Sequence, residues 1–166
     1  MNLKIVPVGV LDTNCYLVVC HNTLYIIDPG AEAENIVAET GELEFERVRV
    51  LLTHGHIDHI SALPDLITMI PVEAIYLSPD EEKLYRSPAN QIQPWLPAVK
   101  NLPDTVTTVW KEDFEVLPTP GHTEGGVCFL FESLKMLFCG DTLFAGSIGR
   151  TDLPGGSHSR LLRSIQ

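Results

Sequence analysis

The segment Thr53–His59, with the sequence THGHIDH, constrains this chain more than any other part of its sequence. It holds three of the six histidines of the chain, together with an aspartate. A buried imidazole is costly without a polar partner, so packing alone gives no reason to cluster histidines in this way. Because His and Asp side chains bind transition metals, the segment predicts a metal site, and metal-ion catalysis is the function that it favours.

The position of this segment in the chain indicates how its side chains are presented. Val48–Leu52, directly before it, is a continuous apolar run that predicts a buried strand. In a helix, His54 and His56 would point about 200° apart, whereas in an extended loop residues i and i+2 face the same side. We therefore expect a loop that aims both histidines at one ion. Asp58 and His59 follow at the turn into the next helix and are expected to address a second ion.

Two later residues fit the same pattern. His122 lies in a Pro-Gly-His-Thr loop between two strand-like runs, and Asp141 follows an apolar strand in a Cys-Gly-Asp-Thr segment. Loops at strand ends carry functional groups more often than the strands themselves. A lone loop His or Asp is weak evidence, but beside the THGHIDH segment we expect both residues to be metal ligands.

Composition and charge exclude several classes of partner. The 166 residues suffice for a single domain, residues 1–166, and the hydrophobic content of 45% is that of a globular protein. The net charge of −11, with no run of Lys or Arg, argues against a nucleic-acid partner. No apolar stretch reaches the roughly 18 residues of a membrane span, and no signal peptide is evident. Four cysteines without a C-x-x-C pair are typical of reduced thiols, so we expect a cytoplasmic protein.

The rest of the sequence predicts alternating strands and helices. Strands are expected at Leu3–Val8, Cys15–Val19, Leu24–Ile27, Val48–Leu52, Ala74–Leu77, Thr105–Trp110, Phe114–Leu117, Val127–Phe131 and Lys135–Cys139. Helical segments are expected at Ala31–Thr40, Ser61–Ile70, Asp80–Arg86 and Ser157–Ile165. We expect the strands to pack in sheets, with helices covering the outer faces. Trp95 and Phe144 are expected to be core residues rather than pocket residues.

With its H-x-H-x-D-H segment, the later Gly-His-Thr and the strand-ending Gly-Asp-Thr, the chain resembles the metallo-β-lactamase superfamily over residues 5–160. The resemblance implies an α/β fold, a four-layer αββα sandwich with a dinuclear site at one edge of its two sheets. It also implies the ligands, namely His54, His56 and His122 for the first metal, Asp58 and His59 for the second, and Asp141 as a bridge between them. Asp28, in an Ile-Asp-Pro-Gly segment, matches the first aspartate of the family and would orient a ligand imidazole from outside.

One family element is missing from the sequence. Members supply a last histidine to the second metal from a strand near the C-terminus, often in a Gly-His-Gly context. Here the sequence ends at Gln166, and His158, in a Gly-Gly-Ser-His segment, is expected to be a surface or helix-start residue. Either the natural chain continues with that strand or the second site is impaired. We expect the first, because a missing edge strand would expose the sheet and the core.

Residues 139–156 resemble the glyoxalase II-like hydrolases most closely. This family hydrolyses thioesters of glutathione, typically S-lactoylglutathione, and the chain resembles its short form. Arg150 falls where the family carries a basic residue that binds the glutathione carboxylate, whereas Asp152 replaces an expected aromatic residue. The resemblance implies two divalent metal ions, with zinc expected first and iron or manganese as alternatives. Between two such ions the pKa of water falls from about 15.7 to about 7, and Asp58 would orient the resulting nucleophile as well as ligate.

Two alternatives stay open. Persulfide dioxygenases share the fold and the Gly-Arg-Thr-Asp stretch seen at residues 149–152, and they bind one iron through two His and one Asp. The Gly-Asp-Thr-Leu-Phe stretch at residues 140–144 favours the hydrolase. A non-catalytic metal-binding domain is the other alternative, although structural zinc sites are usually rich in cysteine. The sequence therefore favours a small-molecule thioester as substrate, with no nucleic-acid or membrane partner.

Overall fold

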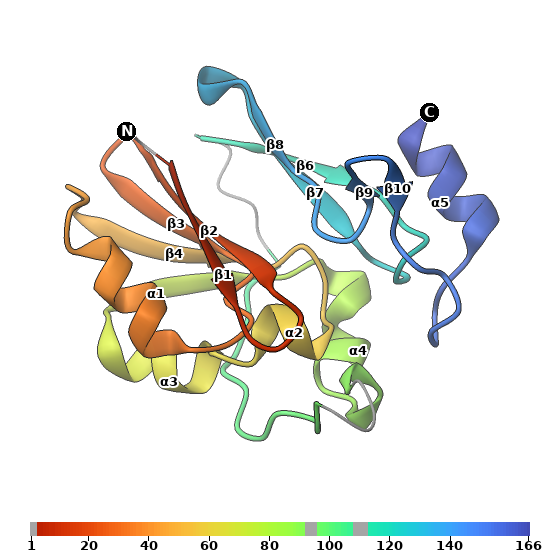
Figure 1. Cartoon of the computed structure of the whole chain (residues 1–166), viewed down its shortest axis with the longest axis horizontal. Coiled ribbons are helices and arrows are strands. Elements are labelled where there is room, and N and C mark those ends of the chain that lie inside the picture. The colour runs from red at the N-terminus through yellow and green to blue at the C-terminus, as the bar shows by residue number, and fades with distance from the viewer. Residues whose placement is uncertain (1–2, 92–95, 108–112) are drawn as a thin grey trace.

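Two β-sheets form the centre of the molecule, as a computed structural model that describes residues 3–91, 96–107 and 113–166 shows (Figure 1). In the larger sheet the strands lie in the order β1-β2-β3-β4-β5, antiparallel from β1 to β3 and parallel from β3 to β5. Its strands are β1 (Leu3–Val8), β2 (Thr13–Cys20), β3 (Thr23–Ile27), β4 (Arg47–Leu51) and β5 (Val72–Tyr76). The sheet is therefore mixed.

The smaller sheet is antiparallel, and a short hairpin follows it. The strands of this sheet and hairpin are β6 (Glu115–Pro118), β7 (Val127–Phe131), β8 (Met136–Phe138), β9 (Leu143–Phe144) and β10 (Ser147–Ile148). The α-helices are α1 (Ala33–Thr40), α2 (Ile57–Ile60), α3 (Leu63–Met69), α4 (Glu82–Tyr85) and α5 (His158–Ile165). Short 3₁₀ turns lie at Pro79–Glu81 (η1), Pro88–Asn90 (η2) and Glu132–Leu134 (η3).

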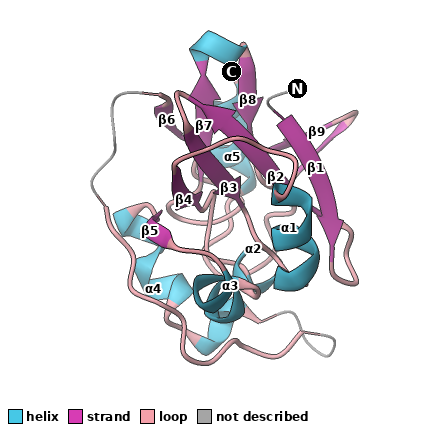
Figure 2. Ribbon diagram, turned by 90° about the vertical axis from the view of Figure 1, so that its left-hand side faces the viewer, coloured by secondary structure: helices cyan, strands magenta, loops and turns pink. Residues whose placement is uncertain are grey.

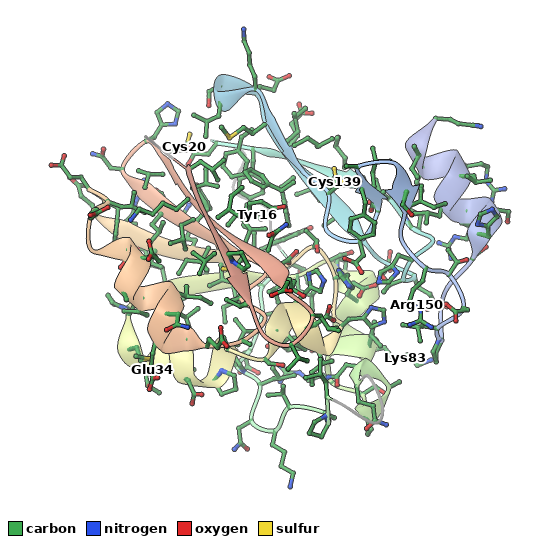
Figure 3. All side chains as sticks on the ribbon, in the orientation of Figure 1. Tyr16, Cys20, Glu34, Lys83, Cys139 and Arg150 are labelled. Carbon is green, nitrogen blue, oxygen red and sulfur yellow. The ribbon has the colours of Figure 1, made fainter. Side chains whose placement is uncertain are left out.

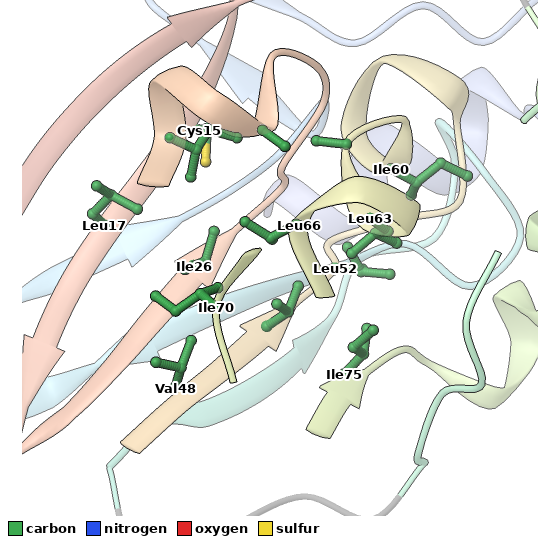
Figure 4. Packing of buried hydrophobic residues seen from close by; sticks show 14 of the residues in the cluster. Cys15, Leu17, Ile26, Val48, Leu52, Ile60, Leu63, Leu66, Ile70 and Ile75 are labelled. Carbon is green, nitrogen blue, oxygen red and sulfur yellow. The ribbon is translucent and has the colours of Figure 1, made fainter. Parts of the chain in front are cut away.

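The hydrophobic core has two parts, one on each face of the larger sheet. Side chains alternate between the faces along a strand, so Ile26 packs in one cluster and its neighbour Ile27 in the other. The first cluster lies between the sheet and helices α1 and α3, where Leu63 and Leu66 are fully buried (Figures 2 and 4). The second lies between the two sheets and includes Phe129 of β7. The molecule thus has a helical layer, the larger sheet and the smaller sheet in that order.

Helix α5 packs against the loop between β6 and β7. The backbone N–H of Ser157 donates to the carbonyl of Gly121 (2.7 Å), and the Ser164 hydroxyl donates to that of Pro120 (2.8 Å). Leu161 is fully buried, and His158, the first residue of the helix, is exposed as expected. The mixed α/β fold is confirmed, while the complete αββα order with a further C-terminal strand stays a prediction.

Most elements lie where the sequence predicts them, and β1 and β7 have the expected bounds. The helix expected at Ser61–Ile70 is confirmed as α3, with Pro64 in its first turn, a position that proline favours. The short helix α2 precedes it and was not predicted as a separate element. Of the strand expected at Thr105–Trp110, residues 108–110 lie outside the described residues, and Val106 forms one parallel bridge with Tyr76. None of the helices in the described part of the chain has the length and hydropathy needed to cross a bilayer.

Candidate metal centre

The parallel pairing of β3 and β4 brings the first site residues to one edge of the larger sheet. Ile27 pairs with Leu51 at the ends of these strands, so the residues that follow each strand meet. The backbone N–H of Asp28 donates to the carbonyl of Leu51 (3.1 Å). After β4 the chain runs as a non-helical loop to α2, as predicted, and this loop carries His54 and His56.

Three buried imidazoles form a first ligand group, which consists of His54, His56 and His122. His122 comes from the β6–β7 loop of the smaller sheet, so both sheets contribute. Its Nε2 lies 2.9 Å from Nδ1 of His56, and the ring centroids of His54 and His122 are 4.8 Å apart. All three side chains are at most 4% exposed. The structure therefore brings together the three residues predicted to hold the first metal.

A second group consists of His54, His59 and Asp141. His59 lies in α2, and Asp141 follows β8. One carboxylate oxygen of Asp141 is 3.3 Å from Nε2 of His59, and the other is 3.5 Å from Nε2 of His122. Asp141 thus lies between the two groups, where the resemblance places a bridging ligand.

Asp58 lies beside the second group without belonging to either group of three. Its Oδ2 is 3.5 Å from Nε2 of His59 and accepts a hydrogen bond from the Thr13 hydroxyl (3.3 Å) at the start of β2. Asp58 also lines a cavity next to the site. From this position the Asp58 carboxylate can contact both a ligand histidine and a bound water. The roles of Asp58 as metal ligand and as catalytic residue stay predictions.

The chemistry of these side chains fits bound cations. His54 Nε2 is buried and has no hydrogen-bond partner among the described residues. Burial and the neighbouring imidazoles lower the pKa of His54 well below its usual value, and they lower that of His56 to about 3. Both imidazoles are therefore neutral, the form that binds metal. Burial also disfavours a charged His59, but Asp28, Asp141 and Asp58 outweigh it and raise its pKa, which indicates a negative potential there.

Two groups outside the ligand set hold ligand histidines in place. Asp28 accepts hydrogen bonds from the backbone N–H (2.8 Å) and the hydroxyl (2.6 Å) of Thr53, and its Oδ2 lies 3.0 Å from Nδ1 of His59. His122 donates from Nδ1 to the carbonyl of Arg150 (2.7 Å). Such outer contacts fix the orientation of a ligand imidazole. Asp28 is thus placed as its predicted supporting role requires.

Arg150 contacts the site only through its backbone carbonyl, and its side chain binds Asp152 instead. Its guanidinium donates two hydrogen bonds to the Asp152 carboxylate, at 2.8 and 2.7 Å, and the pair is exposed (Figure 3). The guanidinium is therefore already bound by Asp152, the residue that replaces the expected aromatic one. Binding of a substrate carboxylate by Arg150 stays a prediction.

Glu81 is a site residue that sequence reasoning missed. It is fully buried, and its carboxylate accepts hydrogen bonds from the backbone N–H groups of Gly55 (2.8 Å) and Gly125 (2.7 Å). Gly55 lies between the two loop histidines and Gly125 follows His122 in the other loop. One carboxylate therefore joins both ligand-bearing loops. The sequence around Glu81 looks like an ordinary polar helical turn and offers no signal for this role.

A cavity of ≈ 410 Å³ opens beside the second ligand group. Its lining includes Asp58, His59 and Asp141 together with the apolar side chains of Leu11 and Phe144. Phe144 is 45% exposed, so its expected place in the core is wrong, because β9 forms a hairpin beside the site instead of packing between the sheets. Trp95 lies outside the described residues. The cavity has the size of a small-molecule site.

Gly140 offers a test of the packing next to Asp141. Its φ is +49°, and an added Cβ would lie 2.2 Å from Oγ1 of Thr53, which donates to Asp28. We expect Gly140→Ala to lower the free energy of unfolding by about 2–3 kcal/mol, since it combines this clash with left-handed backbone strain. Gly146 also has a positive φ, but nothing lies within 4 Å of its added Cβ, so Gly146→Ala should cost only about 1 kcal/mol. Urea unfolding of both variants measures the difference, and equal losses would contradict the packing.

Comparison with known proteins agrees with this geometry. The model of the Metallo-beta-lactamase superfamily matches residues 8–166. Hydroxyacylglutathione hydrolase GloC of Haemophilus influenzae is 39% identical over 177 residues, which cover 100% of this chain and 83% of that protein. The probable metallo-hydrolase YqgX of Bacillus subtilis is 30% identical, with 99% of this chain and 82% of that protein covered.

Two solved structures share the fold over 98% of this chain and 83% of theirs. The di-iron-bound form of TTHA1623 has a TM-score of 0.85 at 31% identity. The BLEG-1 B3 metallo-beta-lactamase has a TM-score of 0.84 at 32% identity. Matched over its sequence and its fold alike, the chain belongs to the metallo-β-lactamase superfamily.

Proposed function

We propose that this metallo-hydrolase cleaves a small thioester, with S-lactoylglutathione as the first substrate to test. The observation that carries the proposal is the position of Asp141, whose two carboxylate oxygens face His59 of one ligand group and His122 of the other. A carboxylate placed between two groups of imidazoles suits two divalent cations. The name of the Haemophilus influenzae relative, a hydroxyacylglutathione hydrolase, supports the same substrate class.

Each residue of the site has a separate role in the proposed hydrolysis. Two bound cations would supply a nucleophilic water with a pKa near 7 and would stabilise the oxyanion that develops on the substrate. Asp58, held by the Thr13 hydroxyl, faces the cavity and orients that water. Asp28 holds the His59 ring, and the Arg150 carbonyl holds the His122 ring. A thiol with a pKa of about 8.5 leaves without a strong general acid, which favours thioesters over amides.

The cavity supports a small substrate with an apolar part. Leu11 and Leu143 are 49% and 47% exposed and line it together with Phe144, so they can cover an acyl or thiol chain. We propose no nucleic-acid or membrane partner. For the metal, zinc is our first choice. A Bacillus subtilis relative named as a zinc-dependent hydrolase supports zinc, and the di-iron form of TTHA1623 keeps iron as an alternative.

Release of free thiol from S-lactoylglutathione tests the proposal. We expect turnover that a chelator abolishes and that zinc, manganese or iron, added back separately, restores to different degrees. Oxygen uptake on glutathione persulfide, measured on the same preparations, tests the dioxygenase alternative. Oxygen uptake with one bound iron and no thiol release would overturn the hydrolase, and metal uptake without either activity would favour a non-catalytic domain.

A further inference from the structure

A second cluster of metal-binding side chains lies at the far end of the larger sheet. It consists of Cys20, His21 and Asp113, which have no part in the metal centre. Strand β2 runs from Thr13, which contacts Asp58, to Cys20, so its eight residues separate the two places by about 20 Å or more. Figure 3 shows Cys20 and Arg150 on opposite sides of the molecule. The cluster is thus a separate feature.

The three ligand atoms converge on one point. Sγ of Cys20 and Oδ1 of Asp113 approach the same ring atom, Nδ1 of His21, at 3.5 and 2.5 Å. In a catalytic Cys-His-Asp arrangement the thiol and the carboxylate would contact different ring nitrogens. Here both contact the same nitrogen, and the three ligand atoms all lie within 4.8 Å of one another, so one ion could take the place of the proton on Nδ1.

The distances suit a zinc-type ion. With bonds of about 2.3 Å to sulfur and about 2.0–2.1 Å to nitrogen, tetrahedral geometry places the two ligand atoms about 3.5 Å apart. This is the separation of Cys20 Sγ and His21 Nδ1. The contact from His21 to Asp113 must widen by less than about 1 Å to admit the ion. His21 can move, because its side chain is 69% exposed, whereas Asp113 is buried and is held by the Tyr25 hydroxyl.

The backbone directs His21 into this arrangement. His21 and Asn22 form the two-residue turn between β2 and β3, and their φ values are +43° and +64°. A two-residue hairpin turn of this type (I′) requires positive φ at both central positions, which Asn and Gly adopt more readily than His. A histidine held in this conformation beside a buried carboxylate indicates a local role for its side chain.

The surroundings leave room for further ligands and attract cations. A hollow of ≈ 240 Å³ lies against the cluster, and its lining includes Glu115, Glu132 and Ser133. The Ser133 hydroxyl is 3.6 Å from Cys20 Sγ. Water or one of these oxygen groups can therefore complete a four-coordinate shell. The net charge of −11 adds a long-range attraction for cations.

We propose that Cys20, His21 and Asp113 form a second cation site, which binds one zinc-type divalent ion independently of the metal centre. The site joins the β2–β3 hairpin of the larger sheet to the residue that precedes Phe114 and β6 of the smaller sheet. An ion there would link the two sheets at the end away from the metal centre. Its effect would be on stability, because an ion that binds only the folded chain shifts the equilibrium towards it.

Cobalt titration of the metal-free protein tests the site, because a thiolate ligand gives cobalt a charge-transfer band in the near ultraviolet. The two ligand groups of the metal centre include no cysteine among the described residues, so we expect the band to report Cys20. We expect the band in the wild-type protein, its loss in Cys20→Ala, and affinity weakened by at least roughly tenfold in His21→Ala. Cys15→Ala and His158→Ala are matched controls, since they remove a core thiol and an exposed imidazole elsewhere, and both should keep the band.

Zinc-dependent melting provides a second measurement. Zinc should raise the melting temperature of the wild-type protein more than that of His21→Ala, because the variant keeps only the metal centre. His21 is exposed, so this variant carries the test even if Cys20→Ala folds poorly by circular dichroism. A band that survives Cys20→Ala, a wild-type protein without the band, or equal zinc shifts in wild type and His21→Ala would each overturn the site. Thioester hydrolysis has no influence on these outcomes.

Discussion

Replacing His56 with alanine is expected to abolish thioester hydrolysis and to release the metal held by the three-histidine group. His56 is 2% exposed, and its Nδ1 lies 2.9 Å from Nε2 of His122. His56 is one of the three imidazoles of this group, so the variant leaves only His54 and His122 there. Changes outside the ligand set typically cost roughly 10–100-fold, so we expect loss of a ligand to lower kcat/KM by more than this.

The same variant separates a two-ion centre from a one-ion centre. The second group, His54, His59 and Asp141, has the two-histidine, one-carboxylate composition of mononuclear iron oxygenases. A one-ion enzyme that uses this group would keep its metal and its activity in His56→Ala. Metal content and kcat/KM should be measured on the same preparation, with His158→Ala as the control. Retention of both quantities in His56→Ala would contradict the two-ion hydrolase.

Glu81→Ala is expected to lower the free energy of unfolding by about 2–6 kcal/mol, because it leaves two buried N–H groups unsatisfied at about 1–3 kcal/mol each. These groups belong to Gly55 and Gly125, at 2.8 and 2.7 Å from the carboxylate. Glu81→Gln should lose less, since its amide keeps one acceptor oxygen. Activity should fall as well, because the loops that carry His56 and His122 lose their common anchor.

Glu82→Gln is the matched control for the two Glu81 variants. Glu82 is the next residue along the chain, but its carboxylate is 47% exposed and binds Arg86 at the surface. Surface ion pairs contribute about 0–1 kcal/mol, so this variant should unfold almost like the wild-type protein. Denaturant unfolding and kcat/KM for all three variants check the prediction. Similar losses for Glu81→Ala and Glu82→Gln would show that the buried carboxylate has no special role.

Local patterns were sufficient to predict most of the fold and the convergence of the ligands. His54 and His56 were predictable because the THGHIDH segment is improbable as packing, and His122 and Asp141 because each follows a strand-like run. Asp28 was predictable only through the resemblance of its Ile-Asp-Pro-Gly segment to the superfamily, and the structure places it after β3, where it meets Thr53 at the end of β4.

The features that local patterns missed depend on contacts between distant segments. Glu81 acts through the backbone of two glycines, and a polar residue in a helical turn looks the same whether it is exposed or buried. Phe144 was expected in the core because apolarity alone does not show that the short hairpin β9–β10 faces a cavity. Tertiary context decided each of these cases.

The contribution of both sheets to each ligand group has a consequence for how the protein gains its metals during folding. His54 and His59 come from the segment after β4 of the larger sheet, whereas His122 and Asp141 come from loops of the smaller sheet. Neither sheet alone can hold a complete group, and contacts between segments so distant in sequence form slowly. High-affinity metal uptake should therefore follow the docking of the two sheets, so the rate of uptake during refolding would report when that docking is complete.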